Sequence, residues 1–243
     1  MQRTLPASSM FSRTFLFITI CIVGMPTQGL LVAREIRAIF LQADRTLPET
    51  AHIFSEQLSE DIQLPRRILS PPLSIPRGEI EITVLTEAPI DPKNLPQNAQ
   101  KLRIPKEWSR CILLFLPSTH STAFPARVIP INASKGEFPL GHTLIFNFSE
   151  ANISGKFGDK VVNIRSRSRA ILPEPREGRG SYRVDIACTL PEYPEPLLIY
   201  GTSWVHTPER RQLMFITPPE GRRKVPMITR VRDHELNLSA EVR

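Results

Sequence analysis

The residues best suited to chemistry in this sequence are arginines at every second position of one segment. Arg165, Arg167 and Arg169 alternate in RSRSRA. Alternate residues of a β-strand point to the same face, so a strand here predicts three guanidinium groups side by side. Such groups can hold phosphate, sulfate or uronate through paired hydrogen bonds. The alternative is a solvated face that attracts anions only weakly.

A second cluster lies in the segment SWVHTPERRQLMFITPP, residues 203–219. Trp204 and His206 alternate onto one face at the end of an expected strand, and two arginines follow in the next turn. A tryptophan beside cationic groups can stack on a sugar ring, although a single tryptophan more often belongs to a core. The candidate ligand-binding residues are therefore Arg165, Arg167, Arg169, Arg183, Trp204, His206, Arg210 and Arg211.

The sequence lacks the familiar catalytic motifs. It has no G-x-S-x-G elbow and no S-x-x-K pair. Its five histidines are isolated, with no H-E-x-x-H or C-x-x-C spacing that would build a metal site locally. We therefore expect no catalytic residue, no metal and no cofactor. A hydrolytic site assembled only by the fold stays open as an alternative.

Two cysteines follow residue 33, Cys111 and Cys188. An oxidising compartment would allow a disulfide between them. The alternating segment SYRVDIACTL predicts that Cys188 faces the core, whereas RCILLFL is apolar on both faces and gives no direction for Cys111. A bridge between two sheets and two buried thiols that act as small hydrophobic groups are both consistent with the sequence.

The formal charge of +7 is unevenly distributed. Basic and acidic residues balance over residues 34–159, so the excess lies in residues 160–243, mostly as arginine. This basic part could bind anionic glycans. A nucleic-acid partner is not expected, because the basic residues are not interleaved with aromatic ones.

Short apolar or alternating runs recur between prolines and predict an all-β fold. These runs are residues 35–43, 51–56, 79–86, 110–116, 126–133, 142–149, 152–157, 160–166, 181–190, 195–206, 211–218 and 225–231. We predict an antiparallel, immunoglobulin-like β-sandwich over residues 34–233, as one large or two small sandwiches with a possible divide near 117–125. Residues 142–164 read as a three-stranded meander with turns at 150–151 and 158–159. Residues 234–243 read as a polar tail.

The first thirty-three residues have the layout of a signal peptide and a signal helix. Arg3 and Arg13 precede an apolar run from Phe15 to Met25, and small residues follow to Ala33. The run is shorter than the roughly 20 residues of a membrane span. We expect a periplasmic or secreted protein. A retained leader that anchors the chain, or a lipid on Cys21, is the alternative.

Several segments resemble known groups of proteins. FPARVIPINAS, residues 142–164 and WVHTPERRQLMFITPP with the closing RVRD resemble an uncharacterised group of secreted β-sandwich proteins from Verrucomicrobia and related bacteria. The resemblance implies export and brings no activity or ligand. ARVIPIN and QLMFITPP also resemble a strand of the periplasmic pilus chaperones, but that strand closes the first of two domains, whereas only a short tail follows here.

These observations predict an exported, non-catalytic β-sandwich protein with a structural or protein-interaction role in the cell envelope or outside the cell. The alternative is a module that binds an anionic polysaccharide or another carbohydrate through the basic residues named above. The expected partners are an envelope or extracellular protein, or an anionic glycan, and a membrane only if the leader is retained.

Overall fold

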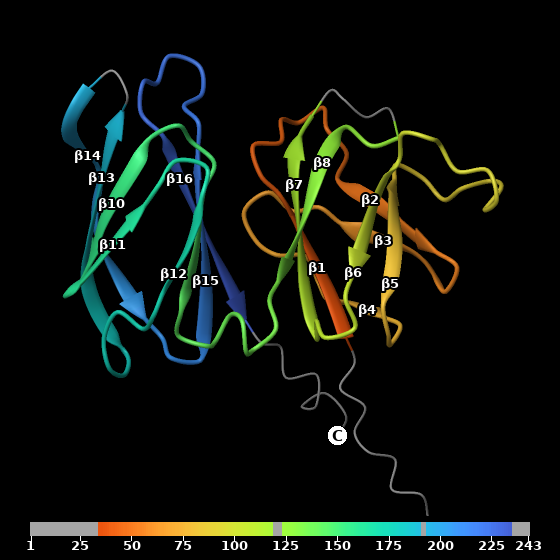
Figure 1. Cartoon of the computed structure of the whole chain (residues 1–243), viewed down its shortest axis with the longest axis horizontal. Helices are drawn as coiled ribbons and strands as arrows, with labels where there is room; N and C mark the ends of the chain where they lie inside the picture. The colour runs from red at the N-terminus through yellow and green to blue at the C-terminus, as the bar shows by residue number, and fades with distance from the viewer. Residues whose placement is uncertain (1–33, 119–122, 191–192, 235–243) are drawn as a thin grey trace, which may run out of the picture. The chain divides into compact units, whose positions relative to one another are not determined.

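The computed structural model describes residues 34–118, 123–190 and 193–234, and these form sixteen strands and no helix. The predicted all-β fold is confirmed (Figure 1). The predicted signal peptide at 1–33 and residues 235–243 of the predicted tail lie outside the described residues.

The strands divide into two sets of eight. The first set is β1 (Arg34–Phe40), β2 (Thr50–Ser55), β3 (Leu58–Gln63), β4 (Leu73–Ile75), β5 (Ile80–Leu85), β6 (Gln100–Ile104), β7 (Arg110–Pro117) and β8 (Ala126–Asn132). The second set is β9 (Thr143–Asn147), β10 (Asn152–Phe157), β11 (Lys160–Ile164), β12 (Arg169–Leu172), β13 (Gly180–Leu190), β14 (Tyr193–His206), β15 (Arg210–Thr217) and β16 (Met227–His234).

The two sets repeat one topology. The first forms the sheets β4-β1-β7-β8 and β3-β2-β5-β6, and the second forms β12-β9-β15-β16 and β11-β10-β13-β14. Each strand of the second set therefore occupies the place of the strand eight numbers earlier. The repeat includes the direction of pairing, because β1 runs parallel to β7 and β9 runs parallel to β15. We call residues 34–132 the first half and residues 143–234 the second half.

Each half buries a core between its own two sheets. In the first half, Phe40 and Phe115 pack against Ile53 and Ile82 of the facing sheet. In the second half, Met214 packs in one cluster with Val184 and Trp204 of the facing sheet. Both halves are thus sandwiches of two four-stranded sheets.

A third hydrophobic cluster joins the two halves. It contains Ile39 and Leu114 from the first half and Phe146, Leu213 and Phe215 from the second. These residues alternate with the core residues of β1, β7, β9 and β15, so these central strands are buried on both faces. The four sheets consequently pack in layers, with β4-β1-β7-β8 and β12-β9-β15-β16 in the middle.

The predicted meander is correct at its second turn and wrong at its first. Strands β10 and β11 pair as a hairpin, and Gly158 in the turn has a positive φ of 60°, which glycine adopts without strain. Strand β9, however, lies in the opposite sheet from β10. All five residues of β9 are buried, so both faces of this strand must be covered by other parts of the protein. Strand β10 exposes every second residue, so a sheet in which β9 paired with β10 would leave one face of β9 uncovered.

Four short strands, two parallel strand pairs and the place of the divide also differ from what the sequence predicts. Strands β3, β4, β6 and β12 were not predicted, because each is short and exposes most of one face, which gives a weak hydrophobic signal. The expected antiparallel sandwich contains two parallel pairs. The segment 117–125 connects β7 to β8 within one sheet, so the divide between halves lies instead between β8 and β9.

Candidate functional site

The predicted row of arginines does not share one strand face. Strand β11 ends at Ile164, so Arg165 follows it, and Arg169 begins β12 in another sheet. Arg167 lies in the intervening turn with a φ of 51° and forms an exposed ion pair with Glu150. The turn breaks the alternation on which the prediction depended.

Arg183 is separate from these arginines. Its Nη2 atom lies 2.7 Å from Asp185 Oδ1 on the same exposed face of β13. The hydrogen bond from Arg183 lowers the pKa of the Asp185 carboxyl, so the two groups satisfy each other. Arg183 is at the end of the β10–β13 ladder near Gly158, whereas Arg165 follows the end where Ile153 pairs with Ile164.

Trp204 and His206 belong to the core of the second half. Trp204 is 2 % exposed and its ring packs against Phe157 and Tyr182. His206 is 1 % exposed, and burial lowers the pKa of its imidazole, whose Nε2 atom lies 3.8 Å from Glu174 Oε2. Neither ring can serve as an exposed platform for a sugar, so this prediction is wrong.

Arg211 is also a buried residue rather than a surface ligand group. Its side chain is 0 % exposed, and Nη2 lies 2.7 Å from Asp233 Oδ2. Its Nη1 atom donates to the carbonyl oxygens of Ala133 at 2.7 Å and Phe138 at 3.0 Å. Those two residues precede β9 and lie beside the first half, so Arg211 ties the two halves together. Its neighbour Arg210 is exposed.

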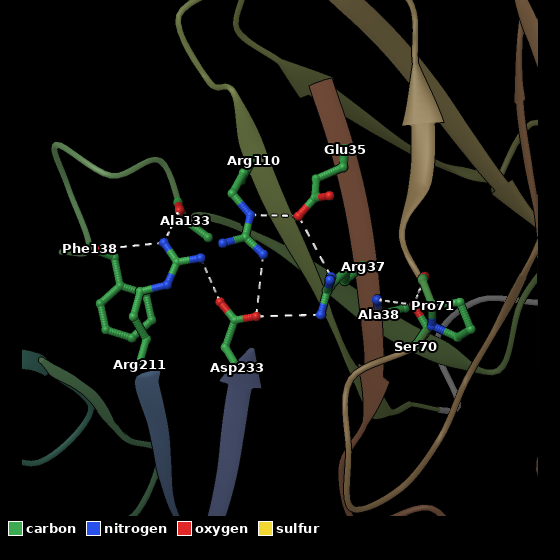
Figure 2. A network of polar contacts seen from close by, with 10 residues as sticks. All are labelled: Glu35, Arg37, Ala38, Ser70, Pro71, Arg110, Ala133, Phe138, Arg211 and Asp233. Carbon is green, nitrogen blue, oxygen red and sulfur yellow. Dashed lines mark hydrogen bonds and ion pairs between the residues drawn. The ribbon is translucent and has the colours of Figure 1, made fainter. Parts of the chain in front are cut away.

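Arg211 is part of a polar network between the two central sheets (Figure 2). Asp233 also lies 3.4 Å from Arg110 of β7 and 3.5 Å from Arg37 of β1. Glu35 accepts a hydrogen bond of 2.5 Å from Arg110 and lies 3.6 Å from Arg37 Nε. Both carboxylates therefore have a closer arginine partner than Arg37.

Arg37 consequently has the longest ion-pair distances of the three arginines in this network. It is 6 % exposed, and its Nε atom has no hydrogen-bond partner. The same side chain borders a cavity of about 740 Å³ at the surface. The lining of this cavity, which we call the arginine cleft, consists of Arg37, Gln63, Pro65, Arg67, Ile68, Leu69, Ser70, Pro71, Arg230 and Arg232.

The wall of the arginine cleft is fixed to the central sheet by Ser70. The backbone N–H of Ser70 donates to the Ala38 carbonyl oxygen at 2.9 Å, and the Ala38 N–H donates to Ser70 Oγ at 2.9 Å (Figure 2). Ser70 Oγ in turn donates to the Pro71 carbonyl oxygen at 2.8 Å. The segment that connects β3 to β4 is thereby held against β1, next to Arg37.

Strand β16 supplies the opposite side of the cleft. Arg230 and Arg232 are two residues apart, so they share one side of this edge strand. The Arg230 guanidinium lies 4.5 Å from the centre of the Trp204 ring. Burial, and then the charge of Arg232, lower the pKa of Arg230. Within the described parts of the chain, neither of these arginines nor Arg67 forms an ion pair.

Among the residues that the structure describes, the lining of the arginine cleft includes four arginines and no carboxylate. Such a group can bind phosphate, sulfate or carboxylate by charge-assisted hydrogen bonds. None of the four was among the predicted site residues. Two sequence signals were available: an arginine inside the apolar strand REIRAIF, and the alternation of Arg230 and Arg232 in RVRD.

The two cysteines do not form the disulfide that was considered. Both thiols are free and buried, with Cys111 in the core of the first half and Cys188 in the core of the second. The alternative in which they act as small hydrophobic groups is therefore the one that the structure shows. Burial raises the pKa of the Cys111 thiol to about 12.

Residues 34–118, 123–190 and 193–234 contain no group of three His, Cys, Asp or Glu side chains that could hold a metal ion. No helix in this part of the chain has the length and apolar character needed to cross a bilayer.

Comparisons with known proteins place the chain in no family. No protein-family model matches it. Its sequence has no significant match among curated proteins.

Proposed function

We propose that this protein is an exported, non-catalytic module that binds an anionic group in the arginine cleft. The observation that carries the proposal is the described lining of the cleft, which includes Arg37, Arg67, Arg230 and Arg232 and no carboxylate. Of these four, only Arg37 has acidic partners among the described residues, Glu35 and Asp233 in the network behind the cleft. Two of these side chains are held in advance, since Arg37 is buried in the network and Arg230 stacks on Trp204. Pre-ordered side chains lose less conformational entropy when a ligand binds.

Export is the part of the proposal that rests on sequence. Residues 1–33 have the layout of a leader, and the resemblance to secreted proteins from Verrucomicrobia and related bacteria agrees with it. In the periplasm or outside the cell, sulfate, phosphate and carboxylate groups occur on polymers of the envelope. The proposed role is to bind such a group without changing it.

Calorimetric titration with sodium sulfate at constant ionic strength tests the proposal. We expect saturable binding to the wild type. In the variant R230Q/R232Q the affinity should fall by about tenfold or more, since hydrogen bonds between charged groups are the strong ones. The matched control is R222Q/R223Q, which removes the same charge from exposed arginines in the β15–β16 connection. Equal loss in both variants, or no saturable binding to the wild type, would contradict the proposal.

Trp204 offers a second readout for the same titration. In the variant W108F it is the single tryptophan of residues 34–243. An anion that draws Arg230 toward the cleft should change the contact of its guanidinium with the indole ring, and with it the fluorescence. A fluorescence change that saturates at the same sulfate concentration as the heat signal would locate the anion beside Arg230.

A structural role by self-association is the second candidate function. Strand β14 is the edge of its sheet and exposes Leu197, Leu198 and Val205. Unpaired edges with apolar side chains can add a strand from another chain, here a second copy. Analytical ultracentrifugation tests this candidate. A dimer that the variant L198K dissociates would support it, and a monomer at high concentration would exclude it.

A further inference from the structure

Three cavities adjoin one another along the surface of the protein. A cavity of about 610 Å³ shares Gln63, Pro65, Arg67 and Ile68 with the arginine cleft of about 740 Å³. On the other side, a cavity of about 260 Å³ shares Arg232 with the cleft. The first two cavities are thus contiguous along four residues, and the third adjoins the cleft at Arg232. We call them together the trough.

The trough extends over both halves. Its first end lies at Glu49 and Thr50, at the start of β2, and at Arg66, which follows β3 in the first half. Its last end lies at Val205, Thr207 and Arg210, where β14 connects to β15 in the second half. The arginine cleft is in the middle, and residues of both halves line it.

Positive charge follows the whole trough. Arg66 and Arg67 line the first part, the arginine cleft follows, and Arg210 lines the last part. Arg66 is held by a hydrogen bond of 3.5 Å from its Nη2 atom to the Leu47 carbonyl oxygen. The one carboxylate in the described lining is that of Glu49. Six arginines spread over both halves match several anionic groups in a row better than one compact anion.

Apolar residues separate these arginines. Pro65, Ile68, Leu69 and Pro71 line the arginine cleft, and Val205 lines the last part of the trough. Ile68 is 66 % exposed although it is a large hydrophobic residue. Apolar surface between cationic groups matches the faces of sugar rings between charged substituents. A polyphosphate chain has no apolar surface to place there.

We infer that the trough binds a linear anionic polysaccharide across both halves, with its sulfate or uronate groups on the arginines and its sugar rings on the apolar residues. This inference rests on the proposed function, since the arginine cleft is its central part. To the proposed function it adds the class of ligand, a linear polysaccharide, and the requirement that this ligand be long enough to span the trough. A chain that spans the trough should bind more tightly than a fragment that fills the cleft alone.

Heparin oligosaccharides of defined length, from disaccharide to octasaccharide, provide the test. We expect the affinity to rise by about tenfold or more between disaccharide and hexasaccharide, because each added charge contact contributes modestly and the contacts accumulate. The central variant R230Q should weaken the binding of every length. The end variants R66Q and R210Q, whose residues line only the outer cavities, should each weaken the hexasaccharide by about fivefold and leave the disaccharide unchanged.

The outcomes separate this inference from the proposed function. Two results would show that no polysaccharide chain binds along the whole trough, while sulfate binding in the cleft would still hold. One is equal affinity for all oligosaccharide lengths, and the other is end variants that bind the hexasaccharide as tightly as the control R222Q/R223Q. Long-chain polyphosphate that binds as tightly as the octasaccharide would overturn the role of the apolar residues. If neither sulfate nor any oligosaccharide binds, both the inference and the proposed function fail.

Discussion

Arg211 and Asp233 lie directly opposite each other on β15 and β16, with 2.7 Å between Arg211 Nη2 and Asp233 Oδ2. Both side chains are 0 % exposed. The arginine also binds two carbonyl oxygens beside the first half, and the carboxylate lies within 3.5 Å of Arg37. This pair therefore stabilises the interface between the two halves and also helps to position Arg37, which lines the arginine cleft.

Removal of Asp233 should destabilise the whole protein strongly. The variant D233N leaves Arg211 buried without its charge partner, and a broken buried pair typically costs about 3–5 kcal/mol. Chemical denaturation measures the free energy of unfolding. The control is E150Q, which removes the partner of the exposed Arg167 and should change stability very little. If D233N unfolds at the same denaturant concentration as E150Q, the network does not stabilise the fold.

The two halves should unfold together. Leu114 and Phe215 belong to one cluster between the central sheets, so neither half can keep its buried face covered alone. In the variant W108F, the fluorescence of Trp204 reports the second half and far-UV circular dichroism reports both. We expect both signals to change at one denaturant midpoint. Two separate midpoints would mean that the interface is too weak to couple the halves.

Acid should weaken the fold partly through His206. Burial lowers the pKa of His206 in the folded protein below its ordinary value of 6.5, so the unfolded chain binds the proton more readily. The free energy of unfolding should therefore fall as the pH falls below about 6.5, until the folded pKa is reached. The variant H206Q should show a flatter dependence between pH 7.5 and 5.5. Identical slopes in the two proteins would refute this role.

The cysteine thiols should be unreactive in the folded protein. Burial raises the pKa of Cys111 to about 12 and also raises that of Cys188, and both disfavour the reactive thiolate. Ellman's reagent at pH 8 should modify neither before denaturant is added. Peptide mapping after labelling distinguishes them from Cys21. Rapid labelling of the native protein at Cys111 or Cys188 would contradict the buried positions.

The sequence predicted the fold class better than the site. Segments such as SYRVDIACTL alternate between buried and exposed residues, and this local pattern was sufficient to predict β13. The layering of the central sheets was not predictable, because a strand such as RCILLFL is apolar on both faces and does not indicate which two surfaces cover it.

The site residues were predicted wrongly for the same reason, because local sequence patterns do not show which surfaces pack together. Arg211 reads as a surface residue because arginine usually is one. Its burial depends on Asp233, which is twenty-two residues away in sequence and opposite only through the pairing of β15 with β16. Arg37 and Arg230 meet at one cleft only because β1 and β16 come from halves that pack together. Contacts of this kind are properties of the tertiary structure.

We expect anions to bind in the arginine cleft rather than over the basic surface in general. The most direct measurement is nuclear magnetic resonance of arginine Nε–H groups in ¹⁵N-arginine-labelled protein during a sulfate titration. We predict saturable shifts of the Arg37 and Arg230 resonances, with Arg165 and Arg222 unchanged. Small, non-saturating shifts of equal size at all exposed arginines, with none at Arg37, would contradict the claim.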